Sequence, residues 1–211
     1  MGIVGGTGPA GRGVAVRVAA AGHDVLVGSR DEARAREVVA GLKVGGEGSI
    51  TGCTNEAAAT GELVVVATPW DAVVATVRPL APLLDGKVVV SMVNALVKQG
   101  REMVALIPPR GSMAAELQAA LPGATVTAAM HHLPAALLED TESGLLADVL
   151  VCGDDAGARR VTCELVDAMD GLRAIEVGSL AQAGPIESFT AACITINIRH
   201  KVHSTVRIAG I

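Results

Sequence analysis

The sequence is almost without aromatic residues. Its 211 residues include no Tyr, one Phe (Phe189) and one Trp (Trp70), although half of them are hydrophobic. Ala, Val, Leu and Ile must therefore pack the core of a chain that is long enough to bury one. This composition favours a parallel sheet whose two faces are covered by helices.

The sequence also lacks basic runs and long apolar runs. The formal net charge is −5, and no cluster of Lys and Arg is present to attract nucleic acid or an anionic membrane. No stretch reaches the roughly 18 uninterrupted apolar residues of a membrane span, and the first residues lack the order of a signal peptide. We therefore expect a soluble, cytoplasmic protein that binds small molecules, with neither nucleic acid nor membrane as a partner.

The four cysteines form no CxxC pair. They are Cys53, Cys152, Cys163 and Cys193. This spacing offers neither a zinc site nor a thioredoxin-like motif, so we interpret them as buried small apolar residues. Asp154 and Asp155 precede a predicted helix and are interpreted as an N-cap and a first-turn acid. We predict no metal site.

Apolar runs of strand length alternate with segments of helix length. Strands are expected at 2–4, 24–27, 63–67, 87–92, 124–130, 149–152 and 172–177, and helices at 12–21, 32–42, after 70, 158–169 and 185–203. This order predicts a Rossmann-type doubly wound parallel sheet with a smaller C-terminal α/β lobe. We expect a dinucleotide-binding domain over 1–145 and a small C-terminal domain over 146–211, sharing an interface because no linker separates them.

A glycine-rich motif lies directly between the first strand and the first helix. It consists of Gly6, Thr7, Gly8, Pro9, Ala10 and Gly11. This is the GxGxxG pattern of dinucleotide-binding proteins, in which the glycines permit a tight turn, close approach of a pyrophosphate and close packing of helix on strand. The N-terminus of the helix adds N–H donors and a partial positive charge. The alternative is a glycine turn with a purely structural role.

The end of the second strand indicates which dinucleotide binds. A carboxylate at this point would bond the ribose hydroxyl of NAD, but the chain has Ser29 and Arg30, followed one helical turn later by Arg34. A guanidinium binds a phosphate dianion through two charge-assisted hydrogen bonds, so NADP is preferred. In the alternative interpretation, these arginines are solvated or pair with Asp31 and Glu32.

Two further strands end in polar or aromatic residues. Thr68, Pro69 and Trp70 follow one strand, while Val93 and Asn94 follow the next. Ligands of open α/β sheets bind at this edge, and Asn94 can bond a carboxamide there. In the alternative interpretation, Pro69 opens a helix and Asn94 caps a turn.

The absence of Tyr restricts the chemistry. A Tyr–Lys proton donor is excluded, so a substrate that needs no strong protein acid fits best, such as a flavin-like ring that accepts a hydride. His131 and His132 can reach the cleft, where one of them would hydrogen-bond a ring carbonyl. The alternative is a pair of exposed loop histidines.

Several segments that are not generic to Rossmann proteins occur along nearly the whole chain. They are Gly5-Gly6-Thr7-Gly8, Gly28-Ser29-Arg30, Ser49-Ile50-Thr51-Gly52, Thr68-Pro69-Trp70, His131 with Leu133-Pro134-Ala135-Ala136, Val151-Cys152-Gly153-Asp154-Asp155, Asp170-Gly171-Leu172-Arg173 and Glu187-Ser188. With these segments the sequence resembles the coenzyme F420-dependent NADP oxidoreductases. The resemblance implies reversible hydride transfer between NADPH and C5 of the deazaflavin F420, in a cleft that the small C-terminal domain closes, without an acid–base residue.

The resemblance also implies site residues. The expected contacts are Thr7, Gly8, Pro9 and Ala10 at the pyrophosphate, Ser29, Arg30 and Arg34 at the 2′-phosphate, Trp70 on the nicotinamide side, and His131, Leu133, Ala135 and Val206 at the deazaflavin. The apolar last helix predicts a homodimer.

The sequence departs from the family pattern in places. Pro9-Ala10 stands where Asn-Leu is expected, Arg34 replaces a lysine, and the last helix diverges most. Two alternatives therefore stay open. One is a reductase that uses NADPH or reduced F420 on another small electrophile, such as an imine or a metal chelate, and the other is a non-enzymatic NADP-binding protein.

Overall fold

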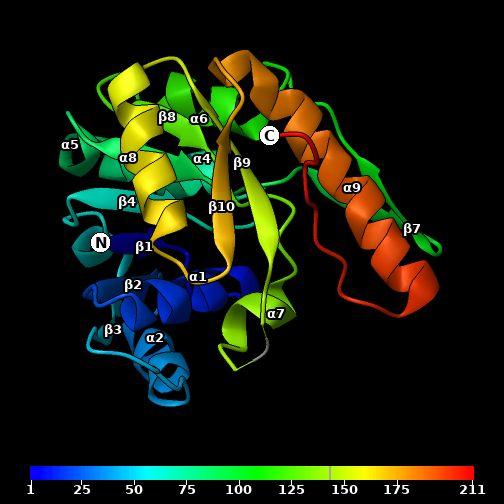
Figure 1. Cartoon of the computed structure of the whole chain (residues 1–211). Helices are drawn as coiled ribbons and strands as arrows, with labels where there is room; N and C mark the ends of the chain where they lie inside the picture. The colour runs from blue at the N-terminus through cyan, green and yellow to red at the C-terminus, as the bar shows by residue number, and fades with distance from the viewer. Residues whose placement is uncertain (143) are drawn as a thin grey trace.

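One eight-stranded sheet runs through the molecule (Figure 1). The computed structural model describes residues 1–142 and 144–211. The strand order is β10-β9-β8-β5-β4-β1-β2-β3. The strands are β1 (Gly2–Val4), β2 (Val25–Ser29), β3 (Ile50–Thr54), β4 (Leu63–Val66), β5 (Val88–Ser91), β8 (Thr125–Ala128), β9 (Ala147–Gly153) and β10 (Leu172–Glu176). The predicted Rossmann-type α/β class is confirmed.

Helices cover both faces of this sheet. They are α1 (Pro9–Ala20), α2 (Glu32–Ala40), α3 (Asn55–Ala58), α4 (Val73–Val77), α5 (Ala81–Leu84), α6 (Met113–Ala120), α7 (Ala135–Glu139), α8 (Ala156–Asp167) and α9 (Ala183–His200), with 3-10 turns at Arg78–Leu80 and Leu180–Gln182. Val64 and Val66 of β4 pack with α4 and α6 on one face, while Val65 packs with α1 on the other. The consecutive valines are therefore buried on both faces, as a central parallel strand requires.

One pair of strands departs from the expected parallel order. All neighbours in the sheet are parallel except β8 and β9, which pair antiparallel at Thr127 with Gly153 and at Ala128 with Cys152. The connection between them contains the short helix α7, which packs on α1. Because this connection does not return to the opposite edge of the sheet, β9 must run back along β8.

The structure contains elements that the sequence pattern did not predict. They are β3, α3, α6, α7 and a separate antiparallel hairpin of β6 (Leu96–Gln99) and β7 (Glu102–Ala105), which packs on α9. The helix expected after Trp70 begins at Val73 and is interrupted by a 3-10 turn before α5. Pro79 lies in the first turn of the 3-10 helix and Pro82 in the first turn of α5. The missing N–H of a proline costs little there, because the first N–H groups of a helix have no partner within it.

A buried arginine fastens α1 to the chain that follows β8. The Arg17 guanidinium donates to the carbonyl oxygens of Leu137 (2.8 Å), Leu138 (3.1 Å) and Asp140 (2.9 Å) at the end of α7, and to that of Asp170 (3.1 Å) before β10. Its side chain is only 4% exposed. The first three carbonyls lie at the C-terminal end of a short helix, where the last carbonyl oxygens have no N–H donor within the helix. The guanidinium supplies donors for these oxygens.

We expect the Arg17→Ala substitution to lower the free energy of unfolding by about 3 kcal/mol, because it leaves several buried carbonyl oxygens without a charged donor. Urea denaturation measures this loss. Arg12→Ala on the same helix is the matched control, since its pair with Glu139 is partly exposed and should contribute less than about 1 kcal/mol. Equal losses in the two variants would contradict the anchoring role of Arg17.

Candidate functional site

A cleft of about 580 Å³ opens at the carboxyl edge of the parallel strands. It lies where β1, β2, β4 and β5 end, between the glycine motif and the segments that follow β4 and β5. The predicted site residues that line it are Thr7, Gly8, Pro9, Ala10, Gly11, Ser29, Arg30, Thr68, Pro69, Trp70, Val93 and Asn94. Segments far apart in the sequence thus meet at one edge, as ligand sites of open α/β sheets do.

Other predicted site residues do not line this cleft. They are Gly6, Arg34, His131, Leu133, Ala135 and Val206. Gly6 ties the glycine turn to β2 by donating its N–H to the Gly28 carbonyl (3.0 Å). Ala135 begins α7, and Val206 lies in the C-terminal segment beside β9, where its carbonyl oxygen accepts from the Asp148 N–H (2.8 Å).

Sequence reasoning missed some residues of the cleft. They are Gly5, Asn55, Ala67, Ala72, Thr76, Met92 as a lining residue, and Leu96. Asn55 has a clear role, because its Oδ1 accepts the N–H of Gly5 (3.0 Å) and thereby holds the turn after β1. Gly5 itself has a φ of +70°, a backbone conformation that glycine adopts without strain. The position of Asn55 directly after a strand was the available signal, but β3 itself was not predicted.

The N-terminus of α1 faces this cleft without a protein cap. Gly8 is the N-cap residue, no side chain of residues 1–142 or 144–211 bonds the free N–H groups, and the first turn holds no acid. By contrast, Asp31 caps α2, Ser112 caps α6 and Asp155 caps α8. Free N–H groups and the helix dipole together favour an anion such as a pyrophosphate. Pro9 lacks an N–H, so the donors come from the residues after it.

The glycines of the motif differ in what surrounds them. A Cβ on Gly11 would lie 2.7 Å from the Gly6 Cα, so glycine is needed there for helix and turn to pack. A Cβ on Gly8 would meet no protein atom within 4 Å. Gly11 therefore serves the fold, whereas Gly8 leaves the helix end open to a ligand, in agreement with the roles expected from the motif.

The cation expected at the end of β2 is available to a ligand. Arg30 is exposed, lines the cleft and makes no ion pair with any other described residue. The acids that could have neutralised it are engaged elsewhere: Glu32 pairs with Arg36 (2.6 Å), and the Asp31 carboxylate accepts from the Arg34 backbone N–H. The Arg34 side chain pairs with Glu37 rather than with Asp31 or Glu32 (2.8 Å).

Two buried polar atoms of the cleft have no partner. Thr68 Oγ1 and Asn94 Oδ1 are buried and lack a hydrogen bond to any described residue. Asn94 is oriented, because its Nδ2 donates to the His131 carbonyl (3.0 Å). Unsatisfied buried polar atoms are costly, so a hydroxyl and an amide oxygen at this position indicate a polar ligand such as a carboxamide.

The two histidines are buried rather than exposed, so their interpretation as exposed loop residues is wrong. Each is 4% exposed, and none of their ring nitrogens bonds another described residue. Burial lowers both pKa values, that of His131 to about 3, so both rings are neutral near pH 7. The His132 ring contacts the edge of Phe189 on α9, with centroids 6.3 Å apart.

The four cysteines and the acids Asp154 and Asp155 make contacts typical of structural residues. Cys53, Cys152 and Cys193 are buried and Cys163 is partly buried, and burial raises the pKa of each thiol. The expected order of the two acids is wrong by one residue: Asp155 is the N-cap of α8, its first turn holds no acid, and the Asp154 carboxylate lies before the helix and accepts from the Leu180 N–H (2.9 Å). Outside residue 143, no three His, Cys, Asp or Glu residues gather as metal ligands, and no helix has the length and hydropathy to cross a membrane.

Comparisons with known proteins agree on one family. A family model described as NADP oxidoreductase, coenzyme F420-dependent, matches residues 1–95. The chain is 35% identical to the F420-dependent NADP reductase of Methanocaldococcus jannaschii, covering 96% of this chain and 94% of the relative. It is 34% identical to that of Methanothermobacter thermautotrophicus, covering 96% and 90%.

Solved structures agree with the fold. A crystal structure attributed to an F420-dependent NADP reductase of Arthrobacter sp. FB24 is similar with a TM-score of 0.83 at 25% identity, covering 99% of this chain and 98% of that one. An imine reductase of Bacillus cereus is similar with a TM-score of 0.64 at 19% identity, covering 92% of this chain and 59% of that one. The second likeness shows a shared fold and nothing about activity.

The two glycines give a test of the cleft. We expect Gly8→Ala to weaken NADP⁺ binding about tenfold, because the new methyl group enters the space of the ligand. Its stability should fall by no more than about 1 kcal/mol, the cost of Ala in place of Gly at an N-cap. Gly11→Ala should lose about 1–3 kcal/mol of stability as well, because its methyl group overlaps the backbone. Calorimetric titration measures the NADP⁺ affinity of each variant, and urea denaturation measures its free energy of unfolding. Unchanged NADP⁺ binding in Gly8→Ala would argue against this pyrophosphate site.

Proposed function

The chain belongs to the family of coenzyme F420-dependent NADP oxidoreductases, and on that premise we propose how its residues hold the two cofactors. The enzyme transfers a hydride reversibly between NADPH and C5 of the deazaflavin F420. The observation that carries this conclusion is the match to F420-dependent NADP reductases over nearly the full length of both chains. In the direction that reduces F420, the hydride leaves C4 of the nicotinamide with its electron pair and bonds to C5 of the deazaflavin. A proton from solvent completes the reduced coenzyme.

The phosphates of NADP have two candidate positions. The uncapped end of α1, with Thr7, Gly8 and Ala10 beside it, suits the pyrophosphate. Ser29 and Arg30 suit the 2′-phosphate, because a hydroxyl lies at the end of β2 beside a guanidinium that has no ion pair with any residue the structure describes. Arg34, one turn further on α2, adds positive charge but is partly neutralised by Glu37.

The nicotinamide would then lie further along the cleft. Thr68 Oγ1 and Asn94 Oδ1 supply the unpartnered polar atoms that a carboxamide needs, and the half-exposed Trp70 lies beside them in the lining. These residues hold the ring in place, which suffices for hydride transfer because the rate depends on how closely the two reacting carbons are aligned.

The deazaflavin contacts remain a proposal from the family resemblance. They are His131, Leu133, Ala135 and Val206. A neutral His131 ring can donate a hydrogen bond to a ring carbonyl without delivering a proton to it. The buried, unpartnered nitrogens of this residue fit such a role.

We also propose that residues 1–145 form the NADP-binding domain and residues 146–211 close the deazaflavin side of the cleft.

The half-exposed apolar residues Phe189 and Ile196 on α9 support association as a homodimer. The cytoplasm, where NADPH is available as a small diffusible reductant, is the expected compartment.

Mixing the protein with NADPH and F420 should bleach the visible absorbance of the oxidised deazaflavin, and NADP⁺ with reduced F420 should restore it. Heat-denatured protein is the control. Reduction of an imine by NADPH in the absence of F420, without any bleaching of F420, would favour the alternative reductase instead.

We expect Arg30→Ala to weaken NADPH binding by about 2–3 kcal/mol, the scale of a charged hydrogen-bonded contact, and to leave NADH binding unchanged. Arg36→Ala is the matched control, because Arg36 lies on α2, pairs with Glu32 and does not line the cleft. An equal loss for both dinucleotides would contradict the assignment of Arg30 to the 2′-phosphate.

A further inference from the structure

Helix α1 forms one wall of the cleft and also reaches segments far along the chain. Its first residues, 9–11, line the cleft. Further along the helix, the buried Arg17 guanidinium donates to three carbonyl oxygens at the end of α7 and to the carbonyl of Asp170. Because a helix holds its residues more precisely than a loop does, these bonds set the position of α7 relative to the glycine motif.

Gly13 brings α7 directly onto the backbone of α1. It lies four residues before Arg17 and therefore on the same face of the helix. A Cβ on Gly13 would lie 2.4 Å from the Leu138 Cβ and 3.1 Å from the Glu139 nitrogen. Only glycine permits this approach, so Gly13 and Arg17 together fix how far α7 lies from α1.

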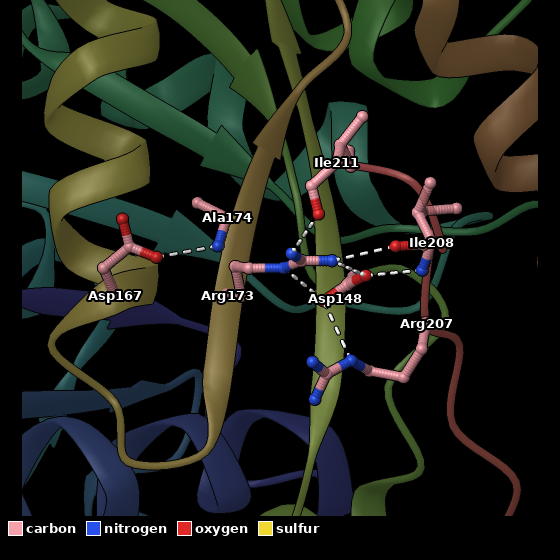
Figure 2. Close-up of polar contacts among 7 residues, drawn as sticks. All are labelled: Asp148, Asp167, Arg173, Ala174, Arg207, Ile208 and Ile211. Carbon is pink, nitrogen blue, oxygen red and sulfur yellow. Dashed lines mark hydrogen bonds and ion pairs between the residues drawn. The ribbon is translucent and has the colours of Figure 1, made fainter.

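The fourth hydrogen bond of the buried guanidinium ends in a turn that is itself fixed. Asp170 lies between α8 and β10, and Asp167 closes this turn by accepting the Ala174 N–H (2.7 Å) (Figure 2). Arg173 of β10 donates two hydrogen bonds to Asp148 of β9, at 2.8 and 2.6 Å (Figure 2). The guanidinium therefore joins α7 to the sheet at β9 and β10.

The chain between β8 and α7 is short and buried. We call residues 129–134 the connector, and every one of them is buried. Met130 has a φ of +64°, a conformation that a residue with a side chain keeps only when its surroundings impose it. Protein interiors are close-packed, so a buried segment cannot absorb a displacement at one end without moving elsewhere. The connector therefore transmits the position of α7 to His131.

The connector is also attached to a second wall of the cleft. Asn94, which follows β5 and lines the cleft, donates its Nδ2 to the His131 carbonyl oxygen (3.0 Å). The connector is thus held from two sides, by α1 through α7 and by the chain after β5. Hydrogen bonds and packed backbone close a ring from the pyrophosphate end of the cleft to the residue expected at the deazaflavin.

We propose that Arg17 is a positioning residue for hydride transfer, because through α7 and the connector it holds His131 at a fixed distance from the dinucleotide and so sets the separation of the two reacting carbons. This inference rests on the function proposed above. Arg17 does not line the cleft; it acts through α7. Its replacement should therefore slow the hydride step and change the affinity for either substrate much less.

The test compares the full chain with Arg17→Lys, which keeps the charge but replaces a planar group of several donors by one ammonium that cannot reach all four carbonyls. Protein loaded with NADPH is mixed with saturating F420, and the loss of deazaflavin absorbance gives the rate constant of a single turnover. This rate constant does not depend on the fraction of protein that is folded. We expect it to fall about tenfold, while the dissociation constant of NADP⁺ and the KM for F420 stay within about threefold of wild type.

A second readout separates positioning from a loss of stability. NADPH that carries deuterium at the transferred position of C4 gives the isotope effect on hydride transfer. In the wild type this effect should change little with temperature, because one distance between the reacting carbons is held. In Arg17→Lys it should depend more steeply on temperature, because several distances are populated.

Gly13→Ala provides a second variant that leaves Arg17 in place. Its methyl group should displace α7 by about 1 Å, the difference between 2.4 Å and an ordinary carbon–carbon contact, and lower the rate constant about tenfold. It decides the question alone if Arg17→Lys does not fold. Leu84→Ala is the matched control: Leu84 is fully buried on α5, before β5 begins and away from the cleft, so this variant should lose stability and keep the wild-type rate constant.

The possible outcomes separate this inference from the function on which it rests. A wild-type chain that fails to reduce F420 would refute the proposed function. Normal wild-type turnover with unchanged rate constants in Arg17→Lys and Gly13→Ala would refute this inference alone. An equal fall in Leu84→Ala would also refute it, because the rate would then follow stability and not the position of α7.

Discussion

The site depends on one geometric constraint, which is the direction of the chain at the carboxyl edge of the sheet. Strands β1, β2, β4, β5 and β8 end at this edge, and β9 begins there because it runs antiparallel to β8. The glycine turn, Arg30, the residues after β4 and β5, the two histidines and Asp148 consequently lie along one side of the molecule. Had β9 been parallel to β8, its first residues would lie at the opposite edge of the sheet.

Helix α1 connects the two halves of this edge. Its first turn faces the cleft with open N–H groups. Its body holds the chain after β8 through three carbonyl bonds of Arg17, and a fourth bond of Arg17 reaches Asp170 before β10. The element that would bind the pyrophosphate of NADP thus also fixes α7 and the loop that carries His131. For a hydride transfer without a protein acid, such fixed spacing between donor side and acceptor side is the main contribution that a protein can make.

The sequence was sufficient to predict the features that depend on local chemistry. The glycine motif, the valine-rich strands and Arg30 at the end of β2 are read from neighbouring residues, and the structure places them together. The antiparallel direction of β9 and the burial of the histidines depend on contacts between distant residues, so no local pattern contained them. Asp148 illustrates the limit: the predicted strand began at residue 149, since a carboxylate is unexpected in a buried strand, and its partner Arg173 is 25 residues away.

The ion pair of Asp148 and Arg173 is a weak source of stability, because the cost of removing the Asp148 carboxylate from water offsets most of its attraction to an arginine that stays partly exposed. Apolar residues of similar size would hold β9 against β10 as well. What apolar residues cannot do is bind the Ile208 N–H and the Arg207 guanidinium in one orientation, as the Asp148 carboxylate does. The value of the pair therefore lies in the fixed place it gives the C-terminal residues beside β9.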